Sequence, residues 1–360
     1  MLYRLLKSMN EEELFQFEIV ALSSADYYVE KIRSLGVPVH ILEISANLRS
    51  FKNIYLLAKL IVRIRPELVN TWMYHADLVG GVLAKIIRIP CVIWSIRQSN
   101  TEYSKYNKLT YFIIKLNSIL SYIVPNKIIC CSSLTASKHV SIGYDRSKMI
   151  VINNGVDTNL YKPSDEAKNN LRKKLGIKNN KYIVGHVARY DPLKGHKLML
   201  ECIQHVLNHY KNVIFLLYGM QIDSMNSELT QLIEDLGIHE DVMLLGHSDR
   251  LYDIYPAMDL LCLTSISEGF PNVLIEAMAC GVPCISTNVS AADEIVGDTG
   301  FVVHDKLPEN ISARIIEYFN NETNIKKEYM KKARQRIIEN YSLQKMKQQY
   351  SDAYLGQIDN

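Results

Sequence analysis

Two glutamates, Glu268 and Glu276, are the residues whose type and spacing suggest chemistry most clearly. Seven residues lie between them, in a segment that follows an apolar run of strand length, 259–264, and enters a helical pattern ending at Gly281. The order is therefore strand, loop, helix. The backbone N–H groups of Gly269–Val273 would then lie at the positive end of a helix dipole, which attracts phosphate.

The two carboxylates would flank any anion bound at this helix start. An ionised carboxylate only accepts hydrogen bonds, so a pair of them beside a phosphate suits ligand hydroxyl groups, such as those of a sugar and a ribose. The alternative is that Glu268 is a solvated loop residue and that Glu276 favours the first helical turns through its charge. The rest of the chain favours the ligand-binding interpretation.

The segment around the glutamates resembles a known motif. It reads Ser267-Glu268-Gly269-Phe270-Pro271-Asn272-Val273-Leu274-Ile275-Glu276-Ala277-Met278-Ala279-Cys280-Gly281-Val282-Pro283. This is similar to the E-x7-E motif of retaining glycosyltransferases of the GT-B fold, in particular glycosyltransferase family 4. The resemblance implies that Glu268 contacts the donor sugar and that Glu276 contacts the ribose of the nucleotide.

A second resemblance lies upstream, where a buried-type strand, 182–188, precedes a helix from about residue 196 to 210. Gly185, Arg189 and Lys194 match the family's Gly-x-x-x-Arg-x-x-x-x-Lys-Gly segment, whose Arg and Lys hold the donor pyrophosphate. Negative charge on a departing nucleotide requires cationic stabilisation. A charge pair at about 4 Å contributes about 4 kcal/mol at an effective dielectric of about 20, so two fixed cations would replace a metal. The alternative is that both are exposed loop charges.

A third segment, 151–163, contains Asn154-Gly155-Val156-Asp157 and resembles the family's Asn-Gly-Val-Asp segment at the end of the first domain. Asn-Gly is also an ordinary turn signal. The three segments occur in the family's order and extend the resemblance over nearly the whole chain.

The resemblance implies a retaining, metal-independent hexosyl- or N-acetylhexosaminyltransferase. It would move a sugar from a nucleotide-sugar substrate to a glycan or lipid-linked acceptor, in bacterial surface polysaccharide or lipopolysaccharide biosynthesis, with no cofactor. No protein nucleophile is evident, so front-face displacement assisted by the donor phosphate is expected. Two alternatives are a nucleotide-sugar epimerase of the same fold and a truncated, inactive nucleotide-sugar-binding protein.

Other classes of enzyme lack their motifs here. No two glycines are separated by a single residue, which excludes the dinucleotide-binding Gly-x-Gly-x-x-Gly pattern. Gly-Lys does not occur, so a P-loop is absent, and no Asp-x-Asp pair is available to hold the metal of the other common glycosyltransferase fold. No nucleic-acid partner is predicted.

Apolar runs alternate with helical patterns along the chain, which predicts an α/β fold with two Rossmann-like, doubly wound parallel-sheet domains. The expected strands are 17–22, 37–42, 68–73, 91–95, 127–131, 149–152, 182–188, 213–218, 242–245, 260–264, 284–287 and 301–303. The predicted domains are an acceptor-side domain (1–165), a nucleotide-sugar domain (166–340) and a terminal helical segment (341–360). The resemblance implies that the two domains face a cleft and that the last helix crosses back to the first domain.

The start of the chain departs from the family pattern. Residues 1–6 resemble the inside of the first helix, so we expect the family's first strand, which is central in such a sheet, to be missing. A second departure concerns residues 94–100. Many members of the family carry a histidine here, on the catalytic side of the first domain, and this chain has no histidine in that segment. His75 is the candidate substitute, although a lone histidine is more often structural. Arg97 is the candidate for holding an acceptor phosphate.

Charge is unevenly distributed. Between Arg49 and Lys148 there are 15 Lys and Arg residues against 4 Asp and Glu, which suggests an anionic partner such as a membrane surface or an acceptor phosphate. The segment 103–115 mixes aromatic, cationic and aliphatic residues as interfacial helices do, and also suits an ordinary amphipathic helix. The run 109–124 is interrupted by Lys115 and Asn117, so it does not span a bilayer.

The seven cysteines lack metal-ligand spacing and are expected to be reduced core residues. No metal site is predicted. The N-terminus does not resemble a signal peptide, because acidic sequence follows the first residues. The expected location is cytoplasmic, at the inner face of the plasma membrane.

Overall fold

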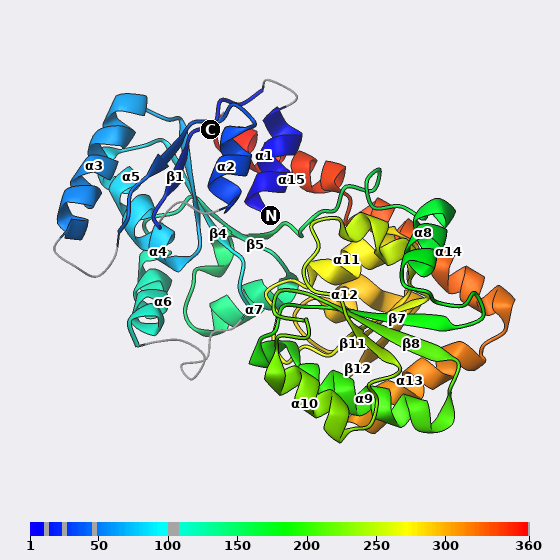
Figure 1. Ribbon diagram of the computed structural model, residues 1–360. Helices are drawn as coiled ribbons and strands as arrows, with labels where there is room; N and C mark the ends of the chain where they lie inside the picture. Colours follow the sequence, from blue (N-terminus) through cyan, green and yellow to red (C-terminus); the bar gives the residue numbers. More distant parts are fainter. Residues whose placement is uncertain (11–13, 24–26, 45–48, 100–107, 359–360) are drawn as a thin grey trace. The chain divides into compact units, whose positions relative to one another are not determined.

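The computed structural model describes residues 1–10, 14–23, 27–44, 49–99 and 108–358. The chain forms two compact units. Unit 1 comprises Met1–Asn154 and Leu343–Asn360, and unit 2 comprises Gly155–Ser342. The chain therefore passes between the units twice, and each unit combines parallel strands with helices (Figure 1).

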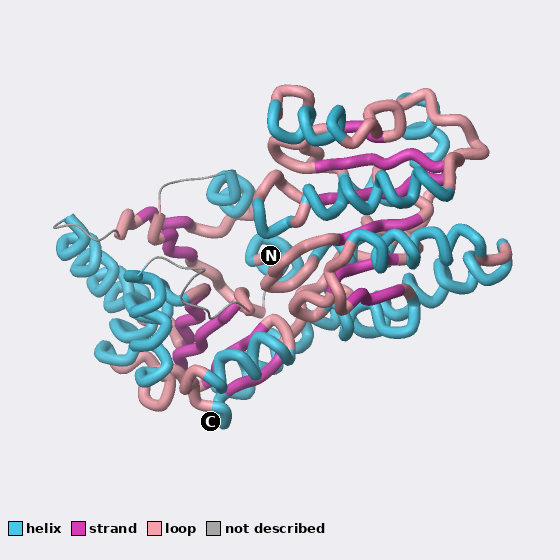
Figure 2. The backbone as a smooth tube through the Cα atoms, turned by 90° about the horizontal axis from the view of Figure 1, so that it is seen from below, coloured by secondary structure: helices cyan, strands magenta, loops and turns pink. Residues whose placement is uncertain are grey.

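Unit 2 contains one six-stranded parallel sheet in the order β12-β11-β10-β7-β8-β9. The strands are β7 (Tyr182–Val187), β8 (Val213–Tyr218), β9 (Val242–Leu244), β10 (Leu260–Leu263), β11 (Cys284–Thr287) and β12 (Phe301–Val303). The helices are α8 (Asp165–Lys174), α9 (His196–His209), α10 (Ser227–Asp235), α11 (Asn272–Ala279), α12 (Ala292–Val296), α13 (Pro308–Asn320) and α14 (Thr323–Asn340). The four central strands are almost fully buried because helices cover both faces (Figure 2).

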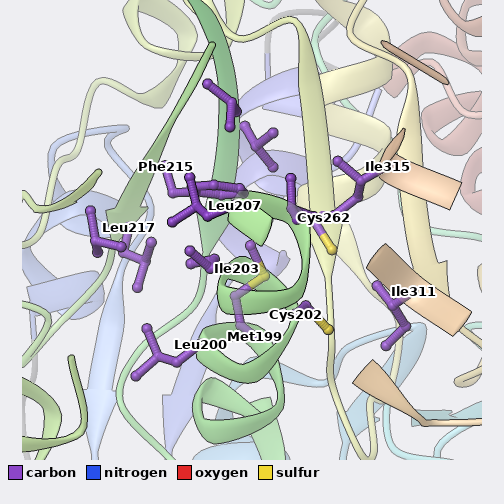
Figure 3. Close-up of a cluster of buried hydrophobic side chains, with 14 of the residues drawn as sticks. Met199, Leu200, Cys202, Ile203, Leu207, Phe215, Leu217, Cys262, Ile311 and Ile315 are labelled. Atoms are coloured by element: carbon purple, nitrogen blue, oxygen red, sulfur yellow. The ribbon is translucent and has the colours of Figure 1, made fainter. Parts of the chain in front are cut away.

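A large apolar cluster fixes α9 and α13 against one face of this sheet (Figure 3). Its labelled members are Met199, Leu200, Cys202, Ile203 and Leu207 of α9, Phe215 and Leu217 of β8, Cys262 of β10, and Ile311 and Ile315 of α13. The spacing on α9 is that of one helical face. Full burial of each large aliphatic side chain contributes about 1.5–3 kcal/mol, so the start of α9 is anchored to the sheet.

The strand order reverses direction at the pair β7 and β10. From β7 the chain moves to β8 and β9 on one side, and from β10 it moves to β11 and β12 on the other. β7 and β10 pair in parallel, so their carboxyl ends are neighbours, and ligands of open α/β sheets bind at such a reversal. The loop after β7 carries Arg189 and Lys194, and the loop after β10 carries Glu268.

Unit 1 contains two parallel sheets, β1-β2 and β3-β4-β5-β6. The strands are β1 (Ile19–Ala21), β2 (Val39–Ile41), β3 (Leu68–Trp72), β4 (Cys91–Ile96), β5 (Lys127–Cys130) and β6 (Met149–Val151). The helices are α1 (Leu2–Asn10), α2 (Tyr27–Arg33), α3 (Arg49–Ile64), α4 (Tyr74–Ala76), α5 (Val82–Ile87), α6 (Lys108–Leu120), α7 (Ser133–Ser141) and α15 (Leu343–Ile358), with a π-helical turn at Asp77–Gly81. The final helix packs on α1 within this unit.

Unit 1 is the unit in which the sequence predicted a missing first strand, and its strands form two separate sheets. Among the described strands, β1 pairs only with β2, and β3, at the edge of its sheet, pairs only with β4. The missing strand itself stays a prediction.

The twelve predicted strands are confirmed, with ends that differ by at most two residues. All seven cysteines are buried and none forms a disulfide, as expected for core residues. Burial raises the pKa of the Cys91 thiol to about 11 and that of Cys262 to about 12. None of the helices in the described ranges has the length and hydropathy that a bilayer crossing requires.

Candidate functional site

The loops after β7 and β10 form the centre of the candidate site in unit 2, and they are hydrogen-bonded to each other. The hydroxyl of Thr264 donates to the carbonyl of Gly195 (2.9 Å), and the amide of Ile266 donates to the carbonyl of Leu193 (2.8 Å). Asp191 closes the first loop internally, because its carboxylate accepts the Leu193 amide (2.9 Å), a contact that lowers the pKa of Asp191. The loops therefore fix each other's positions without a ligand.

Gly195 is required for this contact. Its φ of +68° is a left-handed conformation that favours glycine. A Cβ at this position would lie 2.1 Å from the carbonyl oxygen of Thr264, which is backbone and cannot move aside easily. The close approach of the two loops therefore depends on the absence of a side chain.

Replacing this glycine should separate the loops. We expect Gly195→Ala to lower the free energy of unfolding by about 1–3 kcal/mol, the cost of a strained residue, and to reduce nucleotide binding because the loops shift. Urea denaturation and calorimetry with a nucleoside diphosphate would measure both effects. Gly176→Ala is the matched control, because Gly176 has a φ of +66° and a Cβ added there would have no neighbouring atom within 4 Å. Equal losses in the two variants would contradict the role of the Thr264 contact.

Lys194 and Glu268 form an ion pair at the centre of the site. The Lys194 ammonium lies 2.7 Å from each carboxylate oxygen of Glu268, and the hydroxyl of Ser265 donates to Oε1 of Glu268 (2.7 Å). The Lys194 and Glu268 side chains are only 20% and 11% exposed, so solvent screens the pair weakly. An ammonium has three N–H donors, so Lys194 can also donate to a ligand oxygen.

Arg189 lies in the same loop and is held more loosely. Its Nε and Nη2 donate to Oδ2 of Asp191 (3.2 and 3.0 Å), and its side chain is 59% exposed. An exposed ion pair of this kind contributes only about 0.2–1 kcal/mol. An incoming diphosphate could therefore draw the Arg189 guanidinium away from Asp191 at little cost.

The start of α11 faces the same site. Pro271 is the residue before the helix and Asn272 is its first residue, close to the predicted positions. The Ser290 hydroxyl donates to the carbonyl of Gly269, which ties the loop down, and Phe270 is buried. The positive end of the α11 dipole is therefore placed next to Glu268, where an anion would be stabilised.

These residues border a cavity of about 360 Å³. Its lining consists of Val187, Ala188, Arg189, Lys194, Tyr218, Gly219, Met220, His247, Ser248, Leu251, Glu268, Phe270, Pro271, Asn272 and Val273. The volume is in the range of small-ligand pockets. The structure thus brings together seven of the predicted donor-side residues around one hollow, with Gly269 lying between two lining residues.

Glu276 lies deeper than these residues and is not part of the cavity lining. It is 4% exposed, and the hydroxyl of the fully buried Tyr255 donates to its Oε2 (3.2 Å). Tyr255 belongs to a short turn before β10 and packs against Tyr161. The carboxylate of Glu276 is therefore held in place by an aromatic residue that the sequence pattern did not single out.

Gly185 has a packing role in the structure. It lies in the buried strand β7, outside the cavity lining, and pairs with Leu261 of β10. A Cβ at this position would lie 2.1 Å from the sulfur of Met258. The missing side chain thus makes room for Met258, next to the strand end that carries the site.

One wall of the cavity was not predicted. Tyr218, Gly219 and Met220 follow β8, and 247–251 follow β9. Both segments lie at carboxyl ends of strands, since β8 pairs with β7 and β9 pairs with β8. The rule that located Arg189 and Glu268 would therefore also have located them, given the strand order.

Arg97, predicted on the acceptor side, is a partly buried cation at the carboxyl end of β4 in unit 1. Its Nη1 donates to Oδ1 of Asn154 (3.0 Å), and its guanidinium stacks over the rings of Trp72 (4.5 Å) and Tyr350 (5.5 Å). Its Nε and Nη2 find no acceptor among the described residues. Burial lowers the pKa of Arg97.

His75, the other residue predicted on the acceptor side, is exposed, unlike Arg97. It lies on α4, whose preceding residue, Met73, has a φ of +74°. Such a backbone is strained for a non-glycine residue and occurs often near functional sites. Within the described ranges, no hydrogen bond joins His75 to Arg97. Residues 100–107, which include part of the predicted interfacial segment and the end of 94–100, lie outside the described residues.

Two family models match the chain. The model described as "Glycosyl transferases group 1" matches residues 167–340, and the model described as "Glycosyltransferase Family 4" matches residues 2–160. Each model covers most of one half of the chain, and together they leave only short segments unmatched.

Similar proteins include two bacterial enzymes. One is the Escherichia coli "UDP-Gal:alpha-D-GlcNAc-diphosphoundecaprenol alpha-1,3-galactosyltransferase", 24% identical over 357 residues that cover 97% of this chain and 91% of that protein. Another is the "Capsular polysaccharide biosynthesis glycosyltransferase CapM" of Staphylococcus aureus, 26% identical over 79% of this chain and 76% of the relative.

Among solved structures, Anabaena Alr3699/HepE in complex with UDP and glucose has a TM-score of 0.83 and 22% identity, over 99% of this chain and 95% of that one. Sucrose-phosphate synthase (tll1590) from Thermosynechococcus elongatus has a TM-score of 0.81 and 17% identity, over 98% and 91% of the two chains. At these identities the likeness establishes the fold.

Proposed function

Because this chain belongs to the GT-B glycosyltransferases of family 4, we propose that it is a retaining enzyme that transfers a hexose or N-acetylhexosamine from a UDP-sugar to a lipid-linked acceptor. The predicted fold class, α/β with two Rossmann-like parallel-sheet domains, is confirmed. The sequence-based assignment to glycosyltransferases is confirmed as well. The stereochemistry, the donor and the acceptor are part of the proposal.

The donor would bind in the cavity of unit 2, with its diphosphate at the start of α11. Lys194 and Arg189 would stabilise the negative charge that develops when the bond between sugar and phosphate breaks. Glu268 would accept hydrogen bonds from the sugar, and Glu276 from the ribose. The observation that carries this proposal is the Lys194–Glu268 ion pair on the wall of a ligand-sized cavity beside a helix N-terminus.

Retention is proposed to proceed by front-face displacement assisted by the donor phosphate. Both oxygens of Glu268 lie within hydrogen-bond distance of Lys194, which suits a positioning role better than nucleophilic attack. The acceptor hydroxyl would lose its proton to the departing phosphate. Lys194, Arg189 and the helix amides would supply the charge stabilisation for which other transferases use a metal.

The names of similar proteins support the choice of donor and acceptor. The E. coli relative is named for a UDP-galactose donor and a GlcNAc-diphosphoundecaprenol acceptor, and a neighbouring structure contains UDP and glucose. A lipid-linked acceptor would place the enzyme at the cytoplasmic face of a membrane, in polysaccharide assembly.

The direct test is a panel of UDP-, GDP- and ADP-sugars with GlcNAc-diphosphoundecaprenol as acceptor, with and without a chelator. We expect acceptor-dependent release of UDP, an unchanged rate with chelator, and an α-linked product by NMR. Equilibration of epimers without an acceptor would support the epimerase instead, and nucleotide binding without transfer to any acceptor would support an inactive binding protein. A β-linked product from an α-linked donor would contradict retention.

We also propose that Arg97 holds an anionic group of the acceptor, because its partly buried charge lacks a described carboxylate partner. Arg97→Gln should lower acceptor transfer by about tenfold or more, the effect of losing a hydrogen bond between charged groups. Donor binding in unit 2 should stay unchanged. Acceptor titrations and calorimetry with UDP would separate the two effects, with Arg88→Gln, an exposed position in unit 1, as the control. Normal acceptor KM in Arg97→Gln would contradict this role.

A further inference from the structure

Three helices of unit 1 form a continuous outer layer. α3 packs on α5, and α6 packs on the π-helical turn Asp77–Gly81 that leads into α5. Figure 1 shows α3, α5 and α6 on the same side of the strands of unit 1. Lys148, whose ammonium donates to the carbonyls of Ser121 and Tyr122 just after α6, is close enough to Lys85 of α5 for their charges to interact.

The outward stripes of these helices expose large apolar side chains. On α6, Leu109 is 50% exposed, Phe112 62% and Ile119 67%; on α3, Phe51 is 74% exposed and Tyr55 58%. The positions are spaced as one helical face, and the opposite face of each helix packs into the unit core. Single exposed apolar residues are ordinary, but rows of them on adjacent helices mark an interaction surface.

The charges of the same surface have one sign. α3, α5 and α6 contain no Asp or Glu. Their exposed cationic side chains are Lys52, Lys59, Arg63, Lys85, Lys108 and Lys115. Lys59 lies 5.0 Å from the Tyr55 ring centre and Lys115 lies 5.9 Å from that of Tyr111, so cations and aromatic rings alternate closely. A surface that only needed to be solvated would carry both signs of charge.

We propose that this layer of α3, α5 and α6, the docking layer, binds the surface of an anionic phospholipid bilayer. Lysines would approach the lipid phosphates, and the aromatic and aliphatic side chains would enter the boundary between headgroups and acyl chains. The inference extends the proposed function, since a lipid-linked acceptor would be met at that surface. It assigns binding to three particular helices, whereas the sequence indicated only a basic stretch between Arg49 and Lys148 and an interfacial pattern at 103–115.

The first test measures the electrostatic part. Vesicles of equimolar phosphatidylglycerol and phosphatidylcholine should sediment the protein, vesicles of phosphatidylcholine alone should do so weakly, and added salt should release it. Each lysine near an anionic surface strengthens partitioning by about fivefold, so the triple variant Lys59→Gln/Lys85→Gln/Lys115→Gln should partition about a hundredfold more weakly. Its matched control carries the same change of charge on unit 2: Lys173→Gln/Lys197→Gln/Lys331→Gln, expected to stay within about twofold of the unsubstituted protein.

The second test measures insertion. With Phe112→Trp, the added indole should shift its emission to shorter wavelength when anionic vesicles are added, because it leaves water. Met225→Trp is the control, since Met225 is 89% exposed in unit 2 and should show no shift. Equal partitioning of the triple variant and the unsubstituted protein would overturn the proposal. Binding to vesicles and to a DNA duplex alike, without an emission shift at position 112, would also overturn it, because that result indicates nonspecific attraction to polyanions.

These measurements do not depend on catalysis. A docking layer that fails both tests while the enzyme transfers sugar from a UDP donor leaves the proposed function intact. Conversely, the protein could bind vesicles as expected but release no nucleotide from any donor. That result would support the docking layer and contradict the proposed donor chemistry. Calorimetry with UDP on the triple variant should give an unchanged Kd, which verifies that unit 2 is intact.

Discussion

Lys194→Ala is expected to lower the rate of nucleotide release by about a hundredfold or more, the loss seen when one preorganised group that stabilises transition-state charge is removed. The substitution also leaves the carboxylate of Glu268, only 11% exposed, without its cation next to the bound diphosphate. Steady-state turnover with a saturating UDP-sugar would measure the effect. Lys197→Ala is the control, because Lys197 lies three residues away and its side chain is 74% exposed.

A second substitution separates two roles of Lys194. If the lysine only neutralises Glu268, the double variant Lys194→Ala/Glu268→Gln should turn over about as fast as Glu268→Gln alone. If the lysine stabilises the departing diphosphate, as proposed, the double variant should be slower than Glu268→Gln by about the factor that Lys194→Ala loses in the unsubstituted enzyme. Turnover of Lys194→Ala close to that of the unsubstituted enzyme would remove Lys194 from the mechanism altogether.

Glu276→Gln is expected to weaken donor binding by about tenfold to a hundredfold, the range for hydrogen bonds to a charged group, with a smaller effect on turnover at saturation. The carboxylate is buried and oriented by Tyr255, so its loss should not be compensated by solvent. Calorimetry with UDP and with 2′-deoxy-UDP would measure the change. The unsubstituted enzyme should prefer UDP, and the variant should bind both analogues about equally.

Tyr255→Phe provides the matched control for orientation. It keeps the ring that packs against Tyr161 and removes only the hydroxyl that donates to Glu276. An intermediate loss of UDP affinity is expected, because the carboxylate remains but loses one of the contacts that orient it. An unchanged Kd for UDP in Glu276→Gln would contradict the ribose role.

The position of the site could be predicted from the sequence because its signals are local. The apolar runs 182–188 and 260–264, each followed by a polar loop and a helical pattern, identified two strand ends that carry charged residues. The Glu268 and Glu276 spacing, with Pro271 and Asn272 between them, identified a helix start. Short-range periodicity and turn residues are encoded within a few positions, so they can be recognised without knowing which strands pair.

The partners of these residues depend on contacts between distant segments. Lys194 and Glu268 are 74 residues apart, and their ion pair exists because β10 lies next to β7 in the sheet. The sequence pattern predicted ligand roles for both residues and contained no signal for their mutual pairing. The sequence pattern also contained no signal that Gly185 makes room for the side chain of Met258.

The sequence by itself determined the α/β class, the succession of strands and helices, the family motifs and the excess of positive charge in the first half of the chain. Only the tertiary structure decided that two loops lock together through Gly195, that Tyr255 orients Glu276, and that the cations of α3, α5 and α6 share one surface. The physical reason is that local propensity acts over a few residues, whereas side-chain partnership depends on strand order and packing across the whole unit.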